Sequence, residues 1–146
     1  MSTSRHALPL GLALALVGGG TALADALVRS DEEALAELLD AVASAEGPAR
    51  VDALLGWAHA EGTPVTVSAE GRRARYDDDG ALAEALHEAL EGIESGALEV
   101  VQASTDVRGD DARLTTRLRA GEALVDLELS LRREGQGFAL TSVRAL

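Results

Sequence analysis

The sequence has 146 residues, a formal net charge of −12 and no cysteine. Its length suits one domain, and 47% hydrophobic residues are enough to bury a core, which excludes a wholly disordered chain. Without cysteine there is no disulfide, thiolate nucleophile or cysteine zinc site. The acidic charge and only 2% aromatic residues argue against nucleic acid as a partner, because phosphate binding needs a basic surface.

The first residues have the pattern of a secretory signal peptide. Arg5 supplies a positive start, residues 7–17 form an uncharged stretch rich in Leu and Ala, and Gly18–Gly20 ends it. This stretch is shorter than the roughly 20 apolar residues that cross a bilayer. We therefore expect a cleaved signal peptide over residues 1–24, and no stable membrane span after cleavage.

A signal peptidase site follows the apolar stretch. Ala22 and Ala24 give the small-x-small pattern that the peptidase requires, and Asp25 would open the mature chain. We expect residues 25–146 to form one exported domain, either periplasmic or secreted.

Apolar residues recur at helical spacing in the first half of the mature chain. The predicted helices run from Ser30 to about Ser44, from Pro48 to before Gly62, and from after Asp77–Gly80 to near Gly92–Gly96. Two short strands, Val65–Ala69 and Arg72–Tyr76, interrupt them.

After Gly96 the apolar period changes from helical to two, which is typical of strands with one exposed face. Four strands are expected over residues 98–107, 112–119, 123–132 and 138–146, joined by short turns as an antiparallel meander. The predicted fold class is α+β, with three N-terminal helices on one face of a curved antiparallel sheet of about four to six strands.

This order, and above all the closing stretches 123–133 and 135–143, resembles the nuclear transport factor 2-like superfamily over residues 31–146. The resemblance implies a cone-shaped fold, in which a bent sheet and helices enclose an apolar cavity. The superfamily includes ketosteroid isomerases, scytalone dehydratases, polyketide cyclases and many non-catalytic domains. It also implies a possible homodimer formed through the outer sheet face.

An isomerase of this kind would need a carboxylate base and an oxyanion partner. The candidate catalytic residues are Tyr76, Asp78, His59 and His87. Asp78 precedes a predicted helix, so capping of that helix is the favoured interpretation. Neither histidine has the spacing of a metal motif, and no metal or cofactor is expected.

Two groups of arginines have a structural interpretation. Arg72–Arg75 includes three arginines, which are expected to form a solvated strand edge rather than an anion or RNA site. Arg113, Arg117 and Arg119 are expected to pair across strands with acidic residues such as Asp126 and Glu128.

The inward-facing residues of the meander are the candidate lining of a ligand pocket: Val101, Ala103, Thr105, Leu114, Thr116, Leu118, Val125 and Leu127. The favoured function is therefore non-catalytic binding of a small apolar ligand or a partner protein. The alternatives are an isomerase, dehydratase or cyclase that uses a pocket Asp with Tyr or His, and a cell-envelope assembly module.

Signal cleavage is directly testable. The exported protein should begin at Asp25, because Ala24 completes the peptidase pattern. N-terminal sequencing and intact mass of the protein recovered outside the cytoplasm check this. A mature product that retains Met1 would contradict it.

Overall fold

The computed structural model describes residues 30–93 and 96–146, so the predicted signal peptide lies outside the described residues. The helices are α2 (Asp31–Ser44), α3 (Pro48–Leu55), α4 (Asp79–Ala89) and the short 3-10 helix η1 (Glu91–Ile93). Within the described residues, none of the helices has the length and apolar character needed to span a bilayer.

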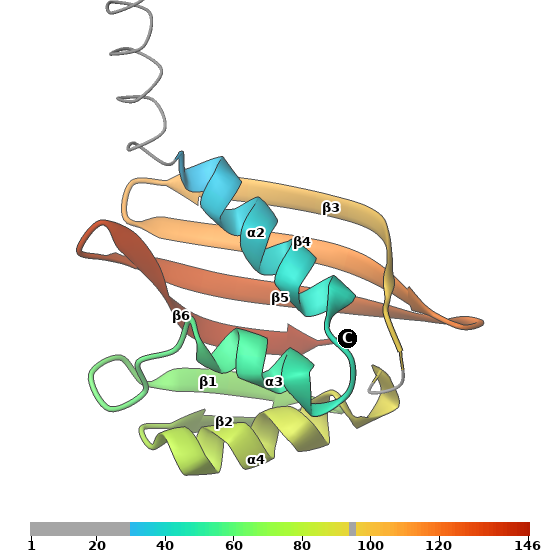
Figure 1. Ribbon diagram of the computed structural model, residues 1–146. Helices are drawn as coiled ribbons and strands as arrows, with labels where there is room; N and C mark the ends of the chain where they lie inside the picture. Colours follow the sequence, from blue (N-terminus) through green and yellow to red (C-terminus); the bar gives the residue numbers. More distant parts are fainter. Residues whose placement is uncertain (1–29, 94–95) are drawn as a thin grey trace, which may run out of the picture. The chain divides into compact units, whose positions relative to one another are not determined.

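Six strands form one sheet: β1 (Val65–Ala69), β2 (Arg72–Tyr76), β3 (Glu99–Arg108), β4 (Asp111–Ala120), β5 (Ala123–Glu134) and β6 (Gly137–Ala145). Their order is β2-β1-β6-β5-β4-β3, and Figure 1 shows the helices on one side of this sheet. The α+β class and the four-stranded meander are confirmed. The structure adds one parallel pair, β1 with β6, because the β1–β2 hairpin joins the sheet beside the last strand.

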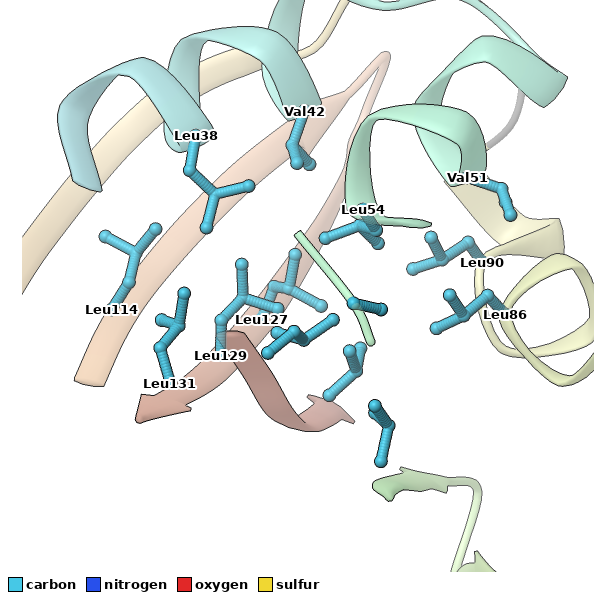
Figure 2. Close-up of a cluster of buried hydrophobic side chains, with 14 of the residues drawn as sticks. Leu38, Val42, Val51, Leu54, Leu86, Leu90, Leu114, Leu127, Leu129 and Leu131 are labelled. Carbon is cyan, nitrogen blue, oxygen red and sulfur yellow. The ribbon is translucent and has the colours of Figure 1, made fainter. Parts of the chain in front are cut away.

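The core lies between the helices and the inner face of the sheet. Figure 2 shows Leu38 of α2 facing Leu114 of β4, with Leu127 and Leu129 of β5 beside them. All four side chains are buried. The inward residues of the meander thus pack against helix leucines, as the period-two pattern requires.

The opposite face of the sheet is polar and carries the cross-strand pairs expected for the arginines of β4. The ion pairs, with their N–O distances, are Arg117–Asp126 at 2.7 Å, Arg113–Glu128 at 3.8 Å and Arg119–Glu99 at 3.3 Å. The last pair reaches β3 rather than β5. The hydrogen bond from Arg117 holds the pKa of Asp126 below its ordinary value.

Two β-bulges interrupt the sheet, one between Val100 and Gln102 of β3 and one where β6 passes Ser130 of β5. A threonine hydroxyl satisfies a carbonyl at each bulge. Thr116 donates to the Gln102 carbonyl at 3.0 Å, and Thr141 donates to the Ser130 carbonyl at 3.1 Å. Bulges increase the local bend of a strand, and the bend of β3 is visible in Figure 1.

Arg50 is the most deeply buried charged side chain that the structure describes, with 1% of its surface exposed. Its guanidinium donates to the carbonyls of Val42 at 2.8 Å, Ala45 at 2.6 Å, Gly96 at 2.7 Å and Ile93. Among the described residues, no carboxylate takes part. Burial lowers the pKa of Arg50, yet an arginine remains charged in proteins, so these carbonyls solvate a permanent cation.

These contacts complete the C-terminus of α2. A helix leaves its last four carbonyls without intrahelical donors, and the last turn of α2 contains no basic residue. Arg50 supplies the donor for Val42, and the backbone N–H of Leu98 donates to Ala43 at 2.8 Å. The end of α2 is therefore capped from α3 and from the segment that enters β3.

Replacement of Arg50 by Met should lower the free energy of unfolding by about 3–5 kcal/mol, since buried carbonyls lose their donors. Arg50→Lys should lose less, because one ammonium keeps the charge but cannot serve four carbonyls. Urea denaturation measures both variants. Arg75→Met, at an exposed position of β2, is the matched control; equal stability of the two Met variants would contradict the role of Arg50.

A second long-range contact joins the start of α2 to the β5–β6 hairpin. Arg133 donates to both carboxylate oxygens of Asp31, at 3.2 and 2.8 Å, and lies 4.8 Å from the centroid of the Phe138 ring. The Arg133 hydrogen bond holds the pKa of Asp31 below its ordinary value. A carboxylate at a helix N-terminus also interacts favourably with the helix dipole.

This pair predicts a pH-dependent contribution to stability. Asp31 has a lower pKa in the folded chain than in the unfolded chain, so it stabilises the fold above the ordinary carboxyl range and stops doing so as pH falls through the folded pKa. The stability difference between wild type and Asp31→Asn should therefore be largest near about pH 7 and shrink below about pH 3. Urea titrations at both values measure it.

Glu32→Gln is the matched control, because Glu32 lies in the same helical turn and is exposed. The Glu32 carboxylate also interacts with the dipole of α2, but it makes no ion pair with Arg133. If the stability loss caused by Glu32→Gln depended on pH as strongly as that caused by Asp31→Asn, the Arg133 contact would contribute nothing specific to the pH dependence.

Candidate functional site

A groove of about 470 Å³ lies between α4 and the β1–β2 hairpin, and we call it the α4 groove. Its lining combines small apolar residues with a few charged ones: Val67, Ala69, Glu70, Arg72, Arg73, Ala74, Tyr76, Ala85, Glu88 and Ala89. The position of these residues follows from strand register. Val67 is buried and lies opposite Ala74, so alternation places Arg72 and Tyr76 on the same face.

Four alanines create the space in the α4 groove. Ala69 and Ala74 come from the strands, and Ala85 and Ala89 lie one turn apart on α4. Protein interiors are close-packed, so larger side chains at these facing positions would fill the volume. The groove is therefore a consequence of small side chains on both sides of a helix–hairpin contact.

An exposed ion pair lies at the opening of the groove. Arg72 contacts Glu88 at 3.2 Å and Glu70 at 3.8 Å, and the side chain of Glu88 is 66% exposed. Exposed ion pairs contribute little to stability. A ligand could therefore displace this pair at small cost, or use either partner for a polar contact.

A second groove of about 760 Å³ adjoins the first, and we call it the C-terminal groove. Ala69, Arg72 and Glu88 line both grooves. Ile93 of η1 and Val125 of β5 extend the second groove towards the end of β6. The two grooves are thus continuous around the Arg72–Glu88 pair.

The structure does not bring the four candidate catalytic residues together. Tyr76 lines the α4 groove, whereas His59 is exposed after α3 and His87 is half-buried on α4. The Asp78 carboxylate accepts the Ala81 N–H at 2.8 Å, which confirms the interpretation of Asp78 as the cap of α4.

Titratable groups that could carry acid–base chemistry are scarce inside the molecule. Among the residues described, the buried polar side chains are Arg50 and Thr116. In the same part of the chain, no cluster of three or more His, Asp or Glu residues is suited to a metal ion. No carboxylate in this set occupies the desolvated position that raises the pKa of a catalytic acid.

The eight residues expected to line a pocket fall into three groups. Leu114, Thr116, Leu118 and Leu127 are buried in the filled core, and Val125 lines the C-terminal groove.

The third group, Val101, Ala103 and Thr105, is exposed, although an inward position was expected. Val101 is the extra residue of the bulge. Ala103 and Thr105 share the inner face with Thr116 and Leu114, but they lie on the edge strand.

The alanines of the groove were not predicted from the sequence. In this region the sequence pointed only to Tyr76, as a candidate catalytic residue, and to the Arg72–Arg75 cluster, as a solvated strand edge. The available signal was the pair Ala85 and Ala89 at helical spacing. Alanine is so common in this chain that the spacing alone does not identify a site.

Comparison with known proteins identifies the fold. A scan against protein-family models finds no match, and neither does a search of curated proteins. Among solved structures, a candidate dehydratase of the nuclear transport factor 2-like family from Streptomyces avermitilis matches with a TM-score of 0.59 and 16% identity. This match covers 79% of the present chain and 94% of the other.

Two further structures agree. A candidate ketosteroid isomerase from Parabacteroides distasonis matches with a TM-score of 0.55 and 12% identity, over 80% of this chain and 86% of that one. A DUF4783 family protein from Bacteroides ovatus matches with a TM-score of 0.56 and 14% identity, over 72% and 90%. With three helices on a bent six-stranded sheet, this chain has the cone fold of the nuclear transport factor 2-like superfamily.

Proposed function

We propose that this chain is an exported domain that binds a small, largely apolar molecule in the α4 groove. The observation that carries the proposal is the groove itself, where alanines from two strands and a helix leave about 470 Å³ beside the Tyr76 ring. Small-molecule sites are typically concave and mostly apolar, with a few polar groups that orient the ligand. Here Arg72 and Glu88 are those groups.

Binding without catalysis fits the groove better than isomerase or dehydratase chemistry, the activities named for two structural neighbours. Such chemistry needs a base held in a desolvated position within reach of the substrate. The carboxylates that line the α4 groove are Glu70 and Glu88; Glu88 is mostly exposed, and both contact Arg72. The groove therefore offers an apolar surface and orienting charges.

Filling the α4 groove with larger side chains should weaken ligand binding. The neutral dye N-phenyl-1-naphthylamine, whose fluorescence rises in apolar surroundings, serves as the probe. Ala89→Leu from the helix side and Ala74→Leu from the strand side should each weaken dye binding by roughly tenfold or more, because the added side chain occupies the ligand volume. Fluorescence titration measures the dissociation constants.

Ala81→Leu is the matched control, since Ala81 is exposed on α4 and lies outside both grooves. Circular dichroism verifies that each variant is folded. Wild-type affinity in both groove variants, or no dye binding by the wild type, would overturn the proposal.

A further inference from the structure

Strand β3 forms one edge of the sheet and has an unusually open outer side. Among the residues that the structure describes, it pairs only with β4 (Figure 1). It has ten residues, none of them Gly, Pro or Lys, and Val100 and Val101 are 40% and 44% exposed. Long edges without Pro or Lys are templates for pairing with another strand, and the bulge at Val101 lies near one end of β3 and leaves residues 102–108 in regular register.

The other edge of the sheet is protected. Strand β2 carries Arg72, Arg73 and Arg75 among its five residues, so like charges would oppose a second copy of this strand. Strand β3 instead has opposite charges near its two ends, Glu99 and Arg108. An antiparallel arrangement of two β3 strands would bring these opposite charges together.

We propose that two copies of this chain associate by antiparallel pairing of their β3 strands, with a two-fold axis at Ser104. Each Ser104 then faces Ser104 of the second copy. The remaining pairs, written with the second copy's residue last, are Thr105 with Ala103, Asp106 with Gln102, Val107 with Val100, and Arg108 with Glu99.

This register is consistent with the faces of the sheet. Pairing with β4 places Glu99, Gln102, Ser104, Asp106 and Arg108 on the outer face, and Val100, Ala103, Thr105 and Val107 on the helix-covered face. Every proposed pair joins two residues of the same face, as a continuous sheet requires. The extra residue Val101 has no partner in this register, as it has none in the pairing with β4.

A neighbouring register is unfavourable. If the axis moved to Ala103, Asp106 would lie opposite Glu99 of the second copy at both ends of the interface, and like charges directly opposite are destabilising. The axis at Ser104 replaces both repulsions with attractions between Arg108 and Glu99. With the axis at Thr105, Arg108 would lie opposite Gln102 and both attractions would be lost. Charge complementarity thus favours the axis at Ser104 and supports the second copy as the occupant of this edge.

The outer sheet face is a poorer interface for two copies. Its centre carries charged pairs such as Arg117–Asp126, whereas the cores of protein interfaces are depleted of charged residues. The edge of β3 presents backbone hydrogen-bonding groups and valines instead.

Single cysteines test the axis directly, because the chain has no native cysteine. In the purified protein, Ser104→Cys should form a disulfide-linked dimer under mild oxidation, since directly opposite residues have Cα atoms about 4.5–5.5 Å apart. Gln102→Cys is the matched control. Two such cysteines would lie four residues apart along the strands, about 13 Å, too far for a disulfide.

A non-reducing gel and intact mass measure the cross-link. A linked dimer of Ser104→Cys but not of Gln102→Cys supports the proposal. No cross-link, or equal cross-linking of the two variants, overturns it.

Charge exchange tests the register in solution by sedimentation equilibrium of the purified protein. The wild type should dimerise, and Arg108→Glu should weaken the dimer roughly tenfold or more, because each Glu99 would face a glutamate. The double variant Glu99→Arg/Arg108→Glu should recover the dimer. This recovery cannot come from the monomer, since the double change breaks the internal contacts Arg119–Glu99 and Arg108–Asp106.

Arg75→Glu on the opposite edge strand is the control and should dimerise like the wild type. A monomeric wild type, or a double variant no better than Arg108→Glu, overturns the proposal.

Discussion

The arrangement of the helices depends on how Arg50 satisfies the end of α2. The guanidinium donates to carbonyls of the last turn of α2, of Ala45 directly after it, of Ile93 at the end of η1, and of Gly96 before β3. These segments are thereby fixed to α3, which carries Arg50. Because an arginine cannot lose its charge, the cost of its burial is offset only while all these carbonyls stay in place. This condition favours the observed arrangement of α2, α3 and η1 around the guanidinium.

The position of the candidate site follows from how the rest of the interior is filled. Leucines from α2, β4 and β5 occupy the region where a cone fold could hold a ligand (Figure 2). Open volume remains at the β1–β2 side, where alanines replace leucines. The proposed binding site is therefore at the rim of the sheet, beside α4, rather than in the centre of the core.

Periodicity predicted most of the fold and little of the site. The apolar spacing located all three helices and the strands that bury one face, because burial imposes it directly on the sequence. The exposed strand β2 carries no such pattern, and α3 ends at Leu55 rather than just before Gly62. The parallel contact of β1 with β6 could not be predicted, since pairing between distant strands leaves no local pattern. Arg50 was missed for a related reason: its partners are backbone carbonyls, which any residue supplies. The groove depends on small side chains that are also common on ordinary surfaces.

The bulge in β6 has a consequence for how the chain can change in length. Leu140 and Val143 both face inward although they lie three positions apart, because Thr141 is an extra residue. Deletion of Thr141 would leave the pairs Leu131–Leu140 and Ser130–Ser142 in place, so Val143 would stay inward and Arg144 outward, and only the local bend of the strand would be lost. Lengthening a hairpin turn such as Gly135–Gln136 would disturb nothing beyond the turn. Natural variants should therefore gain and lose residues in the hairpins and at this bulge, whereas loss of one residue from the regular β4–β5 pairing would turn the side chains beyond it to the wrong face.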